Sequence, residues 1–169
     1  MSYGVQNYQG GTNVLGEVIR VGSEEYIKVY NDTGAAIADG DIYWLSFLKD
    51  ADSLSPSARP TLDAVTSATA AYGNTPRLFC VVANGRFGSG AATIADQAWG
   101  FVQTKGYCPT VKTTGTVTAE DYIQGTTASQ AATTDGTTIT VDSFGVAVTT
   151  AASNLCEAVL FGHPVNFTT

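Results

Sequence analysis

The sequence is poor in the residues that carry charge or perform chemistry. Charged side chains make up 14% of the chain, against about 25% in an average domain. The chain holds one histidine, His163, and a Ser–His–Asp or Cys–His catalyst would have to be built around it. No GxSxG nucleophile elbow occurs. We therefore expect a protein that is not an enzyme, in which His163 has a structural role; a hydrolase centred on His163 is the alternative.

Metal and nucleotide motifs are missing as well. The sequence contains no CxxC or HExxH zinc motif, and the glycines at 85–90 lack the lysine of a phosphate-binding loop. DGD at 39–41 and DAD at 50–52 bring carboxylates together, but neither is followed by the glutamate of an EF-hand loop. Both are more typical of turns, with a loose calcium site as the alternative. We expect no cofactor and no metal.

Basic residues are scarce. The chain has 8 Lys and Arg against 15 Asp and Glu, a formal net charge of −7. Nucleic-acid binding relies on Lys and Arg at phosphates, so we expect no nucleic-acid partner. No apolar run approaches the ~20 residues of a membrane-spanning helix, and the first residues lack the basic and apolar regions of a secretion signal. We expect a soluble protein made in the cytosol, with no membrane partner.

Cysteine usage fits that compartment. Cys80, Cys108 and Cys156 are odd in number and widely spaced, which favours reduced thiols over a disulfide framework. Cys80 lies in LFCVVA, a core-strand context in which cysteine behaves as a small hydrophobe. We expect buried structural thiols.

The pattern of short apolar or alternating runs, separated by Gly, Asn, Asp and Thr, predicts an all-β fold: a small β-barrel or β-sandwich with short strands. The expected strands lie at 17–21, 26–30, 41–47, 78–83, within 93–113, and at 138–150 and 154–165. Lys105-Gly106 is expected to reverse the chain within the fifth of these. Pro60 at a first helical position, with Leu62, Val65 and Tyr72 on one face, predicts at most one short helix over 61–72.

The first sixteen residues differ from the rest. Residues 1–16 carry no charge and no helical or strand period, and they hold a few apolar and aromatic side chains: Tyr3, Val5, Tyr8, Val14 and Leu15. Such a segment cannot form a core alone. We expect an extended N-terminal arm, either a frayed terminus or a segment that orders against a neighbouring subunit. Residues 17–169 are then a single β domain.

One phrase occurs twice. TGAAIADGDI at 33–42 and TGTVTAEDYI at 114–123 align without a gap, and each lies between strand-like runs. In this alignment the second copy has Asp121-Tyr122 where the first has Gly40-Asp41, so the phrase is expected to serve the backbone and not a metal. It predicts equivalent turns in two related halves of one fold, with an insertion at about 47–98 between them.

Stretches around both copies resemble the small capsid decoration proteins (cement, or head-stabilising proteins) of tailed bacteriophages. WGFVQTKGYCPTVKTTG at 99–115 is similar to their strand pair entering the barrel. TVTAEDYIQGTT at 116–127 is similar to their G-x-x-x-x-G-D-x-[IV] element, with Glu120-Asp121 where Gly-Asp is usual; AAIADGDIYW at 35–44 keeps Gly-Asp. FGVAVTTAASNLCEAVLFG at 144–162 is similar to their closing unit. The likeness covers 17–46 and 99–165.

The resemblance implies a virion structural protein that decorates the outer surface of a phage capsid and stabilises it by bridging capsid subunits. Its implied partners are the major capsid protein and further copies of the chain, with a homotrimer favoured. It would be assembled in the host cytoplasm and located on the capsid exterior. Tyr3, Val5, Tyr8, Val14 and Leu15 are then candidates for capsid or subunit contact.

Two alternatives remain open. The first is a phage tail or fibre structural protein or adhesin. The second is a small-ligand-binding β-barrel, with Trp44 and Trp99 lining its cavity.

Overall fold

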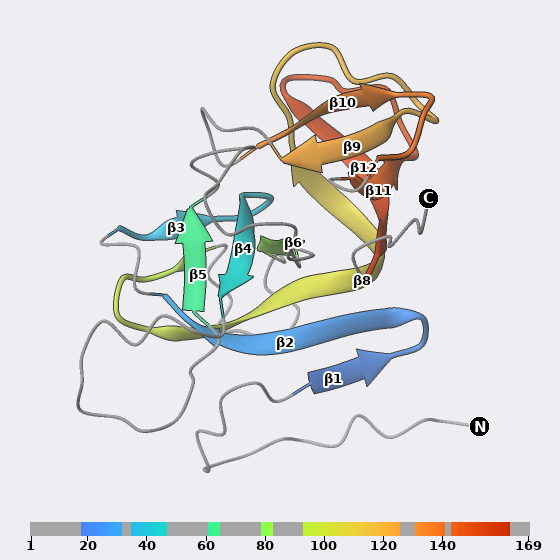
Figure 1. The fold of residues 1–169 in the computed structure, drawn as a ribbon. Coiled ribbons are helices and arrows are strands. Elements are labelled where there is room, and N and C mark those ends of the chain that lie inside the picture. The colour runs from blue at the N-terminus through green and yellow to red at the C-terminus, as the bar shows by residue number, and fades with distance from the viewer. Residues whose placement is uncertain are drawn as a thin grey trace.

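The computed structural model describes residues 18–31, 35–46, 61–64, 79–82, 93–125, 131–140 and 143–162. These residues form strands, bridges and turns and contain no helix, so the expected all-β fold is confirmed (Figure 1). The strands are β1 (Val18–Val21), β2 (Glu24–Tyr30), β3 (Ile37–Ala38), β4 (Ile42–Ser46), β5 (Thr61–Ala64), β6 (Phe79–Val82), β7 (Thr93–Ile94), β8 (Trp99–Lys112), β9 (Tyr122–Gly125), β10 (Ala132–Gly136), β11 (Ser143–Ala147) and β12 (Leu155–Phe161).

Ten of the strands form one sheet, in the order β1-β2-β5-β4-β6-β8-β12-β11-β9-β10, and β3 and β7 pair separately. The neighbours in the ten-stranded sheet are antiparallel except β2 and β5. β2 also pairs with β8. This extra pairing folds half of the sheet back on itself.

The first unit consists of β2, β5, β4, β6 and the first half of β8. Its pairings run β2-β5-β4-β6-β8 and return to β2. The β2–β5 contact is a single parallel pair, Tyr30 with Thr61. The circuit is therefore not closed into a barrel along its length.

The second unit repeats this arrangement. It consists of the second half of β8 with β10, β9, β11 and β12, and its pairings run β9-β10, β9-β11, β11-β12 and β12-β8. A parallel bridge between Thr113, just after β8, and Ala132 at the start of β10 completes the circuit. Strand for strand, β2, β4, β5, β6 and the first half of β8 correspond to the second half of β8, β9, β10, β11 and β12.

Small details outside the strands support the correspondence. The amide of Asn31, after β2, donates to the carbonyl of Ala98 at 2.9 Å, and the amide of Thr113 donates to that of Asn154 at 2.8 Å. Both acceptors precede the last strand of their unit. The residues before them, Gln97 and Ser153, have φ of 55° and 53°. A positive φ is uncommon outside glycine, so two at matching positions indicate one local design used twice.

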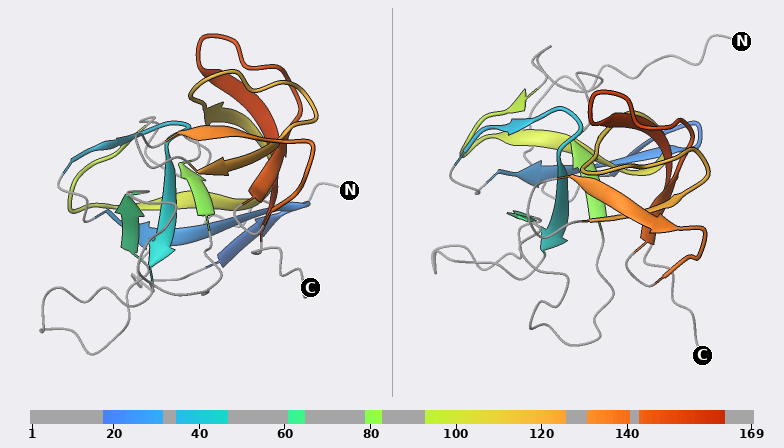
Figure 2. Two further views of the ribbon diagram at one scale, coloured as in Figure 1. Left: turned by 45° about the horizontal axis from the view of Figure 1, so that its top comes forward. Right: turned by 90° about the horizontal axis from the view of Figure 1, so that it is seen from above.

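β8 belongs to both units and runs 14 residues without interruption. Its pairing with β2 extends to Lys105 and its pairing with β12 begins there. The chain reversal expected at Lys105-Gly106 is therefore wrong. Gly106 has a φ of 87°, which bends the strand without ending it, and a Cβ there would lie 2.7 Å from the carbonyl oxygen of Ser23. In Figures 1 and 2 the yellow strand leads from one group of strands to the other.

The helix expected over 61–72 is wrong at its start, because Thr61–Ala64 is a strand. β5 pairs antiparallel with β4, from Tyr43 opposite Ala64 to Ser46 opposite Thr61. Ladder hydrogen bonds to β4 outweigh a weak helical pattern that contains threonine. Residues 65–72 lie outside the described part of the chain. β5, β6 and β7 all fall within 47–98, the stretch expected as an insertion, and each pairs with a strand outside it.

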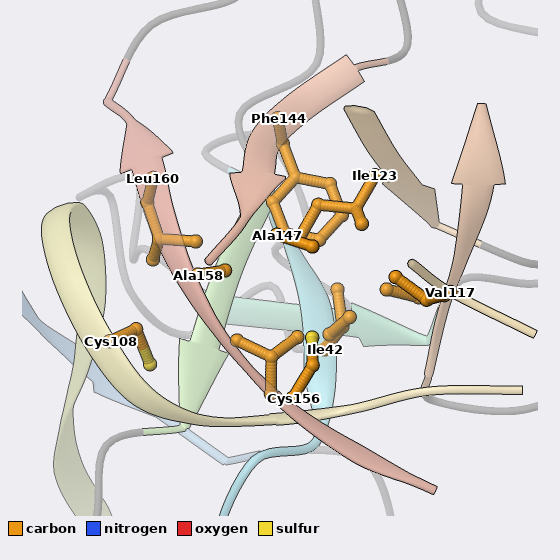
Figure 3. Packing of buried hydrophobic residues seen from close by; sticks show 11 residues of the cluster. Ile42, Cys108, Val117, Ile123, Phe144, Ala147, Cys156, Ala158 and Leu160 are labelled. Carbon is orange, nitrogen blue, oxygen red and sulfur yellow. The ribbon is translucent and has the colours of Figure 1, made fainter. Parts of the chain in front are cut away.

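Each unit has its own apolar cluster. The first contains Ile27, Val29, Ile37, Tyr43, Ile94 and Val102. The second contains Cys108, Val111, Val117, Ile123, Ala132, Phe144, Ala147, Cys156, Ala158 and Leu160. Ile42, from β4 of the first unit, belongs to the second cluster (Figure 3). It is fully buried, so the two units share packing as well as a strand.

Candidate interaction surface

The arm residues expected to contact a capsid or a subunit, Tyr3, Val5, Tyr8, Val14 and Leu15, lie outside the described residues. His163 lies outside them too. Trp44 and Trp99 are on β4 and β8, but their side chains are not among those described. Among the described residues, the two repeated turns and the surfaces of the two units are the candidate sites.

The repeated phrase does form two equivalent turns. The amide of Asp41 donates to the carbonyl of Ala38 at 3.2 Å, and that of Asp121 donates to Thr118 at 3.1 Å. In return, Oδ2 of each aspartate accepts from the amide of the first turn residue at 2.9 Å. The ungapped alignment of the phrases is thus off by one residue, because Asp41 corresponds to Asp121 and not to Tyr122.

The third position of each turn shows the same one-residue offset from the sequence alignment. It is Gly40 in the first unit, with φ of 79°, and Glu120 in the second, with φ of 73°. This is the position that a type II turn places at positive φ and that usually favours glycine. Glu120 accepts a conformation that costs a non-glycine residue about 1–2 kcal/mol. The hydrogen-bonding aspartate is therefore the shared feature of the two turns, and the glycine is not.

Both aspartates are engaged within the protein. Asp41 Oδ1 accepts from Nζ of Lys112 at 2.8 Å, and Asp121 Oδ2 also accepts from Oγ1 of Thr134 at 3.0 Å. Within the described ranges, no group of three or more His, Cys, Asp and Glu side chains is arranged to hold a metal ion. The described geometry assigns Asp41 and Asp121 to holding turns.

Asp41 also ties the first unit to the second. The amide of Lys112 donates to the Gly40 carbonyl at 2.9 Å. A Cβ on Gly40 would lie 3.1 Å from Cγ2 of Thr110. The turn therefore rests directly on the second half of β8, and the Lys112–Asp41 ion pair covers this contact.

Two of the cysteines are inert core residues. Cys108 and Cys156 are buried free thiols, as the sequence predicts. Burial raises the pKa of the Cys108 thiol to about 12 and that of the Cys156 thiol to about 11. Nucleophilic attack needs the thiolate, so neither thiol is activated at neutral pH. The side chain of Cys80, on β6, is not among those described.

An apolar row crosses the solvent-facing side of the second unit. Cross-strand pairing places Tyr107 of β8 opposite Val159 of β12, Val159 opposite Val146 of β11, and Val146 opposite Tyr122 of β9. Tyr107 and Val159 are 41% and 38% exposed, and Val146 and Tyr122 are half-buried. We call these four residues the outer row of the second unit.

The outer row is extended at both ends. The ring of Phe161 lies 6.3 Å from that of Tyr122, centroid to centroid. At the other end, a hydrogen bond to Glu157 raises the pKa of Tyr107. Leu155 and Val148 are also exposed. This is an aromatic and aliphatic strip with a carboxylate at its edge, the composition that favours protein contact over solvent.

Sequence reasoning missed this row, although a signal was present. In LCEAVLF the apolar residues fall on both faces of the strand, with Cys156, Ala158 and Leu160 inward and Leu155, Val159 and Phe161 outward. Apolar residues on both faces are typical of a strand that is covered on both sides. The run was expected only to be a strand.

Comparisons with known proteins give little. No family model matches the sequence, and no curated protein matches it. One solved structure is similar, the head fiber gp8.5 N base of bacteriophage phi29, at 11% identity and a TM-score of 0.44, covering 84% of this chain and 99% of that one. At these values the likeness establishes neither a common fold nor a common function. Of the residues described, none forms a helix able to span a membrane.

Proposed function

We propose that this chain is a structural component of a phage virion that decorates the outer surface of the capsid and bridges capsid subunits. The observation that carries the proposal is the place of the resembling stretches in the fold. Those at 99–125 and 143–162 supply β8, β9, β11 and β12 of the second unit. Those at 18–31 and 35–46 supply the corresponding β2 and β4 of the first. With β10, which lies within 99–165, the resemblance covers every strand of the second unit, and of the first unit it covers β2, β4 and the first half of β8 but not β5 and β6.

The physical properties of the chain suit such a role. Two units that share β8 and the packing of Ile42 form a stiff body, because neither can move without breaking a strand or a core. Many copies on one lattice gain by multivalency, so each contact with the capsid can be modest. The net charge of −7 opposes binding to nucleic acid or to anionic membranes.

The proposal includes the partners and the site of action. The major capsid protein is the principal partner, further copies of the chain form an oligomer with a trimer favoured, and the protein acts on the capsid exterior after assembly in the host cytoplasm. It acts as a scaffold, without catalysis or a cofactor. The arm at 1–16 supplies contacts through its aromatic and aliphatic residues, Tyr3, Val5, Tyr8, Val14 and Leu15.

The test is binding to purified capsid shells of the phage that carries the gene. The full chain and a chain lacking residues 1–16 are mixed with shells, and the bound fraction is measured by co-sedimentation. We expect the full chain to bind and the truncated chain to bind at least tenfold more weakly while retaining its β-rich circular dichroism.

Two outcomes would count against this account. Equal binding by the truncated chain refutes the contact role of the arm. Failure of the full chain to bind shells, together with binding to tails or fibres, refutes capsid decoration in favour of a tail or fibre component. Empty shells are the substrate, so bound nucleic acid cannot explain a positive result.

A further inference from the structure

We propose that the outer row of the second unit (Tyr107, Val159, Val146 and Tyr122) is a docking surface for a second copy of this chain. The inference comes from the duplication of the unit and not from the resemblance to capsid proteins. It deepens the proposed function, on whose oligomer it rests, by naming the surface through which the copies associate, and capsid binding is tested separately.

The first unit has an equivalent row. Cross-strand pairing places Tyr26 of β2 opposite Gln103 of β8, Gln103 opposite Val81 of β6, and Val81 opposite Ile42 of β4. The corresponding strands of the second unit carry its outer row, in the same order. The row of the first unit therefore shows this face of the sheet where another part of the chain lies beside it.

In the first unit the face is covered. Tyr26 and Gln103 are 1% exposed and Ile42 is 0% exposed. Ile42 packs among the core residues of the second unit (Figure 3). The Gln103 side-chain amide donates to the carbonyls of Lys105 and Tyr107, at 3.0 and 2.7 Å, in the part of β8 that enters the second unit. The cover of this row thus includes a β unit of the same fold.

The second row keeps apolar and aromatic side chains although it is the more exposed one, with Tyr107 and Val159 exposed and Val146 and Tyr122 half-buried. Val159 stands where the first row has Gln103. For a face left in water, the opposite change would be expected, because solvent-facing positions of an antiparallel sheet are usually polar. An apolar row that is exposed in one copy of a unit and buried in the other indicates a missing partner.

A second copy of the chain is the occupant that matches this pattern. Within one chain, the second unit covers the row of the first. A unit with the same surface chemistry that could cover the outer row of the second unit is supplied by another copy of the chain. Repeating the arrangement between chains gives a heterologous contact, in which different surfaces of the two copies meet. Such contacts close into a ring, such as a trimer, or continue as a filament. Tyr and Val residues at the centre with Glu157 at the edge fit the usual anatomy of an interface.

The experiment compares two valines that are equally exposed. Val159 in the outer row and Val21 on β1 are both 38% exposed. Val159→Lys and Val21→Lys are made in the full chain, and self-association is measured by sedimentation velocity and equilibrium over a concentration series. We expect the wild type to associate, Val159→Lys to weaken association at least tenfold, and Val21→Lys to leave it within twofold.

Circular dichroism and thermal unfolding show whether each variant is folded. If Val159→Lys does not fold, Tyr107→Lys, on a different strand of the same row and also exposed, takes its place. A wild type that stays monomeric over the series would overturn the proposal. So would association that Val159→Lys leaves intact, which would point to the arm or another face. Capsid co-sedimentation of the same variants is read separately, so failure to bind shells does not decide this question.

Discussion

The two units of this molecule share a strand order, a turn and a local hydrogen-bond design, but they differ in what surrounds them. In the row of the first unit Tyr26, Gln103 and Ile42 are buried, whereas in the outer row of the second Tyr107 and Val159 are exposed and Val146 and Tyr122 are half-buried. Their turn aspartates also differ, because Asp41 pairs with Lys112 of the other unit and Asp121 bonds Thr134 of its own. The first unit therefore receives the second on this face, and the second presents its own equivalent face to solvent.

The largest effect is expected from the residue that joins the two cores. Ile42→Ala removes a fully buried side chain of the first unit from the core of the second. We expect a loss of about 2–5 kcal/mol in the free energy of unfolding, measured by urea denaturation. The exposed Val18→Ala is the control, with a change within about 0.5 kcal/mol. A loss below 1 kcal/mol for Ile42→Ala would show that the units do not depend on each other's packing.

The bend in β8 is tested by two glycines with similar backbone angles. Gly106 and Gly115 have φ of 87° and 74°, but a Cβ meets Ser23 and Glu24 at Gly106 and meets nothing within 4 Å at Gly115. Gly115→Ala carries only the cost of positive φ, about 1–2 kcal/mol. We expect Gly106→Ala to cost at least about 1 kcal/mol more, from overpacking. Equal losses in urea denaturation would mean that the strand does not need the close approach at Gly106.

The two turns are compared by removing their aspartates. Asp41→Ala and Asp121→Ala each remove the acceptor that closes a turn, at a cost of about 1–2 kcal/mol. Asp41→Ala also loses Lys112, a partner whose side chain is 45% exposed, so the ion pair adds only about 0.5 kcal/mol. We expect Asp41→Ala to destabilise slightly more in thermal unfolding.

A double mutant isolates that difference. Combining Asp41→Ala with Lys112→Met should show coupling, because the pair lies 2.8 Å apart. Combining Asp121→Ala with Lys112→Met should be additive. Coupling of the same size in both cycles would contradict the assignment of Lys112 to the first turn alone.

The two described thiols, Cys108 and Cys156, lie in the core of the second unit and contribute a pH dependence to its stability. The pKa of the Cys108 thiol is raised to about 12 in the folded protein, so its contribution is complete below its unfolded pKa, about 8.5. It is lost as pH rises toward 12, because the unfolded chain then binds fewer protons than the folded one. We expect Cys108 to lower stability by up to about 1.4 kcal/mol per pH unit above pH 9.

Urea unfolding at pH 8, 9 and 10 measures this slope. Tyrosines and lysines also titrate in that range, so Cys108→Ala is the control, and the slope should be shallower in it. An unchanged slope would contradict the burial of Cys108. The two thiols should also resist a thiol reagent at pH 7 until the protein is unfolded.

Much of the fold could be predicted from the sequence, because short strands and turns of this kind produce recognisable patterns in residues that are close together in the sequence. Alternation and apolar runs locate β2, β4, β6 and β12. Gly22 marks the β1–β2 turn, and its φ is 61°. The repeated phrase correctly predicts two equivalent turns. These features depend on residues that are close in the sequence.

What failed depends on contacts between distant residues. Residues 61–64 form the strand β5 because they pair with β4. Position 106 needs glycine because the backbone of Ser23 lies close beside it. The turn register is off by one because matching Ala and Ile letters outweigh the aspartate that makes the bond. The apolar residues on both faces of LCEAVLF are a local signal for the outer row, but the sequence does not show which of the two faces the chain itself covers. The arm contacts lie outside the described residues and stay predictions.

The central claim is that one unit occurs twice, and cross-strand NOEs between backbone protons test it most directly. The account predicts NOEs between Val29 and Gly100 and between Val111 and Cys156, which join the first and last strands of each unit. It also predicts them between Ile42 and Val81 and between Tyr122 and Val146. Observation of all four NOE contacts would confirm the duplicated pairing. The account would be contradicted if a contact were observed in one unit while the corresponding strand of the other unit paired with a different strand.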